Sequence, residues 1–208
     1  MDVYRAFVER LAGAPAPRDA INPYAGDGPA AARRDNLALY LTRMAARRPT
    51  MLLVGEAPGY RGCGVSGVPF TSPAILLGEP SPFGLFGAAA GFRLDDAPAT
   101  TREATATIVW ATLVDLGCLP LLWNACPFHP HPPGRADGNR PPTAGEVAAG
   151  EWAVRELLAL FVVARVVAVG NKARVALGRW GILAAPVRHP SHGGKAQFAR
   201  DLARVAGL

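Results

Sequence analysis

The sequence is poor in cysteine and lacks any long apolar run. Only three of its 208 residues are cysteines, and no two of them form a CxxC pair. Isolated thiols without a secretory signal favour a reducing cytoplasm over a disulfide scaffold. Charge, glycine or proline interrupts each apolar run before the roughly 20 residues that a membrane helix requires. We therefore expect a cytoplasmic protein with no membrane span.

The chain also lacks internal repeats, and its length fits one ordinary domain. A chain of this size can bury about 70% of its unfolded surface in a single core. Residues 1–12 mix apolar positions with acidic residues and arginine, which indicates an amphipathic helix and not a signal peptide. We expect a monomer with one domain over residues 1–208, in which residues 1–50 form a helical extension.

Positive charge exceeds negative charge. The formal net charge is +6 at pH 7, and arginine supplies most of the cations. Arginine forms bidentate contacts with phosphates, which favours a polyanionic partner such as DNA. Arginine also accumulates in proteins from GC-rich genomes for compositional reasons, as do alanine, glycine and proline. The net charge alone therefore does not distinguish a polyanionic partner from a compositional effect.

Short apolar runs alternate with helical patterns, as is typical of an α/β sheet. Each run is rich in Val, Ile or Leu, as buried parallel strands are. We expect strands near residues 51–54, 119–123, 162–169 and 185–188. The predicted fold is a three-layer α/β/α sandwich around a central, mainly parallel four-stranded sheet.

Helices are expected between these strands. Thr100 with Glu103, and Thr143 with Glu146, have the spacing of capping boxes, and the second helix should reach about residue 161. Further helices are predicted over residues 36–47, 170–180 and 195–205, and an irregular connection over residues 13–35 precedes the first of them. The long connections 59–91 and 127–142 follow strands that carry candidate site residues, which favours function over disorder.

Polar groups or tight turns follow three of the predicted strands. Gly55-Glu56-Ala57-Pro58-Gly59 follows the first, Asn124 ends the second, and His189-Pro190-Ser191 follows the last. Open α/β sheets bind ligands at the carboxyl ends of their strands. We therefore expect these segments to form one site.

These segments, with Gly67-Val68-Pro69-Phe70 and Asn139-Arg140-Pro141-Pro142-Thr143, resemble the motifs of the uracil-DNA glycosylase superfamily. The similarity runs from about residue 51 to the carboxyl terminus, and the order and combination of the motifs make it specific. The closest match is the iron-sulfur branch, family 4. The resemblance implies a monofunctional uracil-DNA glycosylase, which hydrolyses the N-glycosidic bond of deoxyuridine in DNA and acts in base-excision repair.

The chain departs from family 4 in its cysteines. That branch holds a four-iron cluster with four cysteines, whereas this chain has only Cys63, Cys118 and Cys126. We expect no cluster and no other cofactor or metal. Packing or a polar network should instead fix the segments that the cluster would hold. His129 and His131 lie near Cys126, but their spacing is poor for zinc.

Base recognition is assigned to Phe70, Asn124 and His189. The Phe70 ring suits stacking on a pyrimidine, and the Asn124 amide can pair with the N3–H donor and O4 acceptor of uracil. His189 matches the family histidine that donates to O2 of the departing base. Each of these residues also has a plain structural reading: a core Phe, a strand-end Asn and a helix-cap or surface His.

Water activation is less well defined in the sequence. The best-known branch has an aspartate where this chain has Ala57, so Glu56 is the nearest acid and the second candidate catalytic residue besides His189. Glu56 equally fits a structural carboxylate that accepts loop N–H bonds. Gly59 occupies the position of a tyrosine that excludes the thymine methyl group, and Tyr60 is the expected substitute beside Ala57 in the uracil pocket.

DNA contacts are predicted around the His-Pro-Ser turn. Ser191 should contact a phosphate, and the following loop resembles the one that enters the minor groove. The predicted DNA-binding residues are Arg188, Ser191, His192, Gly193 and Lys195. The alternative functions are a noncatalytic binder of uracil-containing or abasic DNA, which the missing acid at Ala57 would favour, and a hydrolase of small nucleosides.

Overall fold

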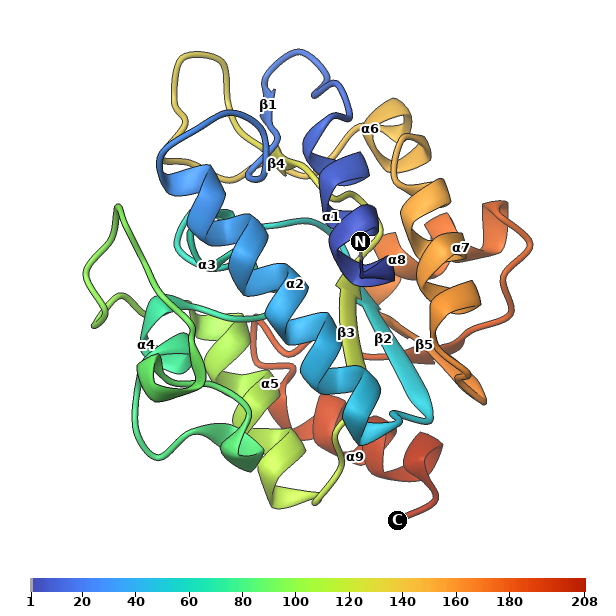
Figure 1. Cartoon of the computed structure of the whole chain (residues 1–208). Helices are drawn as coiled ribbons and strands as arrows, with labels where there is room; N and C mark the ends of the chain where they lie inside the picture. The colour runs from blue at the N-terminus through green and yellow to red at the C-terminus, as the bar shows by residue number, and fades with distance from the viewer. Residues whose placement is uncertain (1) are drawn as a thin grey trace.

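The computed structural model describes residues 2–208, so Met1, which the predicted first helix includes, lies outside the described residues. Four strands form one parallel sheet in the order β3-β2-β5-β6 (Figure 1). These strands are β2 (Met51–Gly55), β3 (Leu121–Asn124), β5 (Arg165–Val169) and β6 (Ala185–Val187). The predicted fold class is confirmed, and each strand lies where an apolar run predicted it, with bounds that differ by a few residues.

Helices cover the sheet, and Figure 1 shows α1 and α2 in front of it. Helix α8 contacts β2, β5 and β6, and α9 packs against β6. The longer helices are α1 (Val3–Ala12), α2 (Pro29–Arg47), α5 (Ala104–Asp115), α7 (Glu151–Leu160), α8 (Gly170–Arg179) and α9 (Lys195–Ala206). The shorter elements are α3 (Cys63–Ser66), α4 (Pro73–Leu76), α6 (Ala144–Ala148) and the 3₁₀ turns η1 (Pro82–Gly84) and η2 (Ala88–Ala90).

Part of the irregular connection predicted over residues 13–35 is regular. Helix α2 begins at Pro29, because proline fits the first turn of a helix, where its missing N–H has no partner to lose. Strand β1 (Ala20–Ile21) pairs in antiparallel fashion with β4 (His129–Pro130). This pairing brings the N-terminal segment to the long connection that follows β3.

Two helix predictions were wrong in detail. Thr100 does not cap α5, because the carboxylate of Glu103 is itself the N-cap and accepts from the N–H groups of Thr105 and Ala106. The helix expected over residues 143–161 is two helices that meet at Gly150. A side chain at Gly150 would overlap the carbonyl of Ala125, so the backbone of this break packs directly on the end of β3. The capping box of Thr143 and Glu146 is confirmed.

The core is one cluster of apolar side chains between the sheet and its helices. Phe7 on α1 meets Trp123 on β3 edge to face, at 5.4 Å between ring centroids. The hydroxyl of Tyr40 on α2 accepts from the N–H of Leu122 at 2.8 Å. Helices α1 and α2 thus pack on the edge strand β3, whose last residue is Asn124. None of the helices within residues 2–208 is long and apolar enough to span a membrane.

Candidate active site

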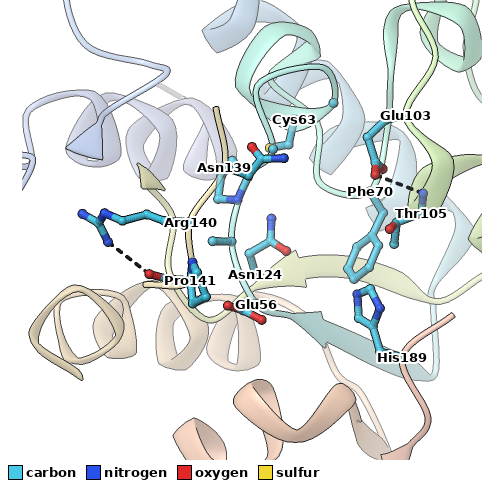
Figure 2. Close-up of a pocket in the computed structure, with 14 residues that line it drawn as sticks. Glu56, Cys63, Phe70, Glu103, Thr105, Asn124, Asn139, Arg140, Pro141 and His189 are labelled. Atoms are coloured by element: carbon cyan, nitrogen blue, oxygen red, sulfur yellow. Dashed lines mark hydrogen bonds between the residues drawn. The ribbon is translucent and has the colours of Figure 1, made fainter. Parts of the chain in front are cut away.

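A cavity of about 300 Å³ opens at the carboxyl edge of the sheet. A volume of this order is at the lower end of the range for small-molecule sites. Figure 2 shows its walls, which the connections after β2, β3 and β6 supply together with the start of α5. Five of the predicted site residues line it: Glu56, Ala57, Phe70, Asn124 and His189.

Asn124 supplies an amide without a protein partner. Only 5% of the surface of Asn124 is exposed. Within residues 2–208 the amide makes no hydrogen bond, although it lines the cavity. The amide faces the cavity and is therefore available to a ligand that offers both a donor and an acceptor.

Gly55 lets two of these residues approach each other. It pairs with Asn124 in the register of β2 and β3. A side chain on Gly55 would collide with the ring of Phe70, and its Cβ would lie 2.8 Å from Oδ1 of Asn124. The first glycine of the β2 turn is therefore required by the packing of the aromatic ring and the amide against the bare backbone.

Phe70 is held in an unusual backbone conformation. Its φ is 54°, which is uncommon for a residue with a side chain. The carbonyl of Phe70 accepts from Nε1 of Trp110 on α5 at 3.0 Å. Backbone strain of this kind persists where the surroundings determine it, and it clusters at binding sites. The ring therefore lies in the cavity at a conformational cost, which is consistent with a binding role.

The contacts of His189 with Ser191 indicate its tautomer. The N–H of Ser191 donates to Nδ1 at 3.2 Å, and Oγ of Ser191 lies 2.7 Å from the same atom. A ring nitrogen that accepts from an N–H carries no proton, so the neutral ring is protonated on Nε2. Burial lowers the pKa of His189 below its ordinary 6.5, against the opposing charge of Glu103. The site therefore contains a neutral imidazole with its N–H available to a ligand.

Glu56 follows β2 and is half-buried at the cavity. Its carboxylate makes no hydrogen bond or ion pair in the described part of the chain, while its backbone carbonyl accepts from the N–H of Cys126 at 2.9 Å. Burial raises the pKa of the Glu56 carboxyl above its ordinary 4.5, and the positive charge of Lys172 acts in the opposite direction. The predicted alternative, a carboxylate that accepts loop N–H bonds, is not what the structure has.

The remaining predicted site residues lie outside the cavity lining. Tyr60 contributes its backbone N–H, which donates to Oδ1 of Asn139, and its ring lies 5.3 Å from the guanidinium of Arg61. Ser191 contacts His189, and its predicted phosphate contact stays a prediction. The other predicted DNA contacts are exposed beside the His189 turn: Arg188, His192, Gly193 and Lys195.

Several cavity residues had no role assigned from sequence. Glu103 and Thr105 come from the start of α5, and Asn139, Arg140 and Pro141 come from the connection after β4. The Asn139 to Thr143 stretch was recognisable as a motif, so its presence was predictable although its roles were not. Glu103 was recognisable only as a helix-capping residue, because its place at the cavity depends on how α5 packs against the sheet.

The cysteines do not fit an iron-sulfur cluster. Cys63 contacts the hydroxyl of Tyr24 at 3.7 Å, and Cys126 donates to the carbonyl of Phe128 at 3.5 Å. Burial raises the pKa of each of these thiols to about 12, so neither favours the thiolate form. Cys118 precedes β3 at the opposite end of the sheet. Within residues 2–208 no group of three or more His, Cys, Asp or Glu side chains could hold a metal ion.

The two histidines near Cys126 contact backbone carbonyls. Nδ1 of His129 lies 3.0 Å from the carbonyl oxygen of Pro58, and its Nε2 lies 3.1 Å from that of Ala136. Nδ1 of His131 lies 2.9 Å from the carbonyl oxygen of Pro132. His129 thus joins the turn after β2 to the connection after β4.

Comparisons with known proteins identify a family and support the fold. The family model described as the uracil DNA glycosylase superfamily matches residues 43–203, which is well over half of the chain. The crystal structure of wild-type Pedobacter heparinus SMUG2 is similar, with a TM-score of 0.62 over 98% of this chain and 97% of that chain. At 16% identity this likeness shows the fold alone. No curated protein matches the sequence significantly.

Proposed function

The chain belongs to the uracil DNA glycosylase superfamily, and from this premise we propose that it is a monofunctional uracil-DNA glycosylase. The reaction hydrolyses the N-glycosidic bond of deoxyuridine in DNA, releases uracil and leaves an abasic site for base-excision repair. The observation that carries this proposal is the buried, unpartnered amide of Asn124 beside the ring of Phe70.

The Asn124 amide suits uracil. Uracil presents an N3–H donor next to the O4 acceptor, and one amide meets both through its oxygen and its NH₂ group. Cytosine presents the reversed pattern, so selectivity requires that the amide keep one orientation in the complex; a mispaired buried group then costs roughly 1 to 3 kcal/mol. Extrusion of the base from a duplex costs a few kcal/mol, and stacking on Phe70 offsets about 1 to 3 kcal/mol of this.

His189 is the proposed electrophilic residue. Negative charge develops on O2 of uracil as the glycosidic bond breaks. The Nε2–H group of a neutral imidazole is a fixed donor for that charge, and the contacts with Ser191 support this tautomer. Glu56 is proposed to position the attacking water as a carboxylate that has no competing protein partner.

A noncatalytic binder of uracil-containing or abasic DNA is the second candidate. Ala57 favours it, because no carboxylate stands at the position that carries one in the best-known branch. The half-buried carboxylate of Glu56 one residue earlier favours catalysis. The two candidates differ in turnover and not in binding.

Single-turnover cleavage of uracil-containing DNA, read out by alkaline scission of the abasic site, tests the proposal. His189→Gln should slow cleavage by about 100-fold or more, because the lost donor acts on transition-state charge. Its affinity for uracil-containing DNA should change much less. Asn124→Asp should lower uracil cleavage and admit cytosine, since a protonated carboxyl group can donate to N3 of cytosine and accept from its amino group.

Arg179 is exposed at the far end of α8, so Arg179→Gln serves as a control for the preparation of variants and should cleave like the wild type. Wild-type protein that binds uracil-containing DNA without any turnover would replace the proposal with the noncatalytic binder. Near wild-type uracil cleavage by both Asn124→Asp and Asn124→Ala would contradict the assigned base reading.

A further inference from the structure

The proposed reading of uracil leaves the C5 edge of the base without a partner. In this proposal the Asn124 amide pairs with N3–H and O4, and His189 donates to O2. Asn124 ends β3 and His189 follows β6, and these are the two outer strands of the sheet. The C5 atom lies next to C4, so its edge faces the wall beyond Asn124. Figure 2 shows Asn139 in that wall, on the far side of Asn124 from His189.

The sequence-based candidate for this edge, Tyr60, does not line the cavity. Its ring is directed to the Arg61 guanidinium, and only its backbone N–H takes part in the wall. The cavity residue that precedes it is Gly59, which has no side chain. The wall at this point must therefore come from another segment.

Asn139 covers Gly59. A Cβ on Gly59 would lie 3.7 Å from both Oδ1 and Nδ2 of Asn139, which is van der Waals distance. The N–H of Tyr60 donates to Oδ1 of Asn139 at 3.1 Å. This bond sets the orientation of the amide, because the oxygen is the atom that accepts. The Nδ2 group makes no hydrogen bond within residues 2–208, and Asn139 is solvent-exposed at the cavity.

The connection that carries Asn139 is held on both sides. The ring of His129 contacts the carbonyls of Pro58 and Ala136, and Ala136 lies three residues before Asn139. Arg140, the next residue, donates to both carboxylate oxygens of Glu146 at 2.8 and 2.6 Å and to the carbonyl of His131 at 2.9 Å. The amide is thus presented by an anchored segment.

We propose that Asn139 is a specificity-determining residue that reads the C4–C5 edge of the base, an inference that rests on the proposed function. Its free Nδ2 donates to the O4 side of uracil. A methyl group at C5 would lie against this polar amide and keep Nδ2 away from O4, which leaves the donor unpaired, so thymine is rejected. Rejection depends on the polar amide above Gly59 and not on the ring of Tyr60.

Single-turnover rates on matched oligonucleotides with uracil or thymine at one position test this inference. Asn139→Ala should lower the ratio of uracil to thymine rates by about 10-fold or more, the usual range for one methyl group in a pocket. The isosteric Asn139→Asp keeps an acceptor for the Tyr60 N–H but replaces the free donor with an acceptor. It should lower the uracil rate while thymine stays uncleaved.

Two comparison variants complete the design. Asp137→Ala changes an exposed residue of the same connection and should retain the wild-type ratio. Tyr60→Ala tests the sequence-based candidate and should also retain it. Unchanged thymine rejection by Asn139→Ala, with uracil cleavage intact, would overturn the inference, as would relaxed rejection by Tyr60→Ala alone. Failure of the wild type to cleave uracil would instead refute the proposed function.

Discussion

At the scale of single residues, the positive charge of Lys172 acts on the carboxyl group of Glu56 without an ion pair between them. Burial raises the pKa of Glu56 above 4.5, and the positive charge of Lys172 opposes this rise. A carboxylate that must be ionised to position water loses activity as the pH falls through its pKa. The acidic limb of the rate profile is therefore expected above 4.5.

Lys172→Met should move this acidic limb to higher pH. Removal of the cation removes the effect that lowers the pKa of Glu56, so the carboxylate takes up its proton earlier as the pH decreases. Single-turnover rates with saturating enzyme, measured across the pH range, separate this shift from weaker DNA binding. Arg179→Met removes the same charge from the other end of α8 and should leave the limb in place. Equal shifts in the two variants would exclude a specific effect of Lys172.

The site was predictable from sequence where a side chain lies at a strand end. Glu56, Asn124 and His189 follow apolar runs directly, so the parallel sheet alone brings them together. Tyr60 does not line the cavity, because one residue of a turn decides the direction in which a ring points. The contact of Asn139 with Gly59 joins positions far apart in the chain, and no local pattern encodes it.

At the scale of elements, Arg140 joins three segments around the cavity. Its guanidinium bonds the carboxylate of Glu146 in α6, the carbonyl of His131 and, at 2.9 Å, the carbonyl of Asp19 beside β1. Glu146 is almost fully buried, with 3% of its side chain exposed. This polar network fixes the N-terminal segment to the connection that carries Asn139.

Glu146→Gln should destabilise the fold by about 3 kcal/mol, because it leaves the Arg140 guanidinium without its buried counter-charge. Glutamine still completes the capping box, so the loss reports the ion pair. The measurement is chemical denaturation at neutral pH. Glu151→Gln breaks an exposed pair with Arg155 and should cost no more than about 1 kcal/mol. Similar losses in the two variants would contradict a special role for the Arg140 pair.

The same variant has a defined pH dependence. The Arg140 hydrogen bonds, against the cost of burial, lower the pKa of Glu146 to about 2. A carboxyl group with a lowered folded-state pKa contributes its full stability above the unfolded value of about 4.3 and loses it as the pH falls toward 2. The stability difference between wild type and Glu146→Gln should therefore shrink only in this acidic range.

Element boundaries were less predictable than element order. The alternation of apolar runs and helical patterns was sufficient for the four parallel strands and their sequence in the chain. The start of α2 at Pro29 and the break between α6 and α7 were missed. The break depends on Gly150 packing against Ala125, which is a tertiary contact.

At the scale of the whole molecule, the net charge of +6 is expected to act on DNA without regard to sequence. Lysine and arginine displace counterions from phosphates, so log affinity should fall with log salt by roughly 0.7 to 0.9 per phosphate contacted. Reading of the uncharged uracil through Phe70 and Asn124 should add a preference that salt barely changes. Titrations of His189→Ala with uracil- and thymine-containing oligonucleotides over several salt concentrations measure the two effects separately.

Two results would contradict this expectation. Binding that does not depend on salt would remove DNA as the partner and favour a small nucleoside as substrate. A preference for uracil that disappears at high salt would mean that the base is read through phosphate contacts and not through the cavity.

The bond between Trp110 and Phe70 gives the cavity an intrinsic optical reporter. The indole N–H of Trp110 donates to the carbonyl of the residue on which the base is proposed to stack. Emission from an indole responds to changes at its N–H partner. Binding of a base against Phe70 should therefore change the fluorescence of Trp110. Occupancy of the site can then be followed in real time on protein without an attached dye.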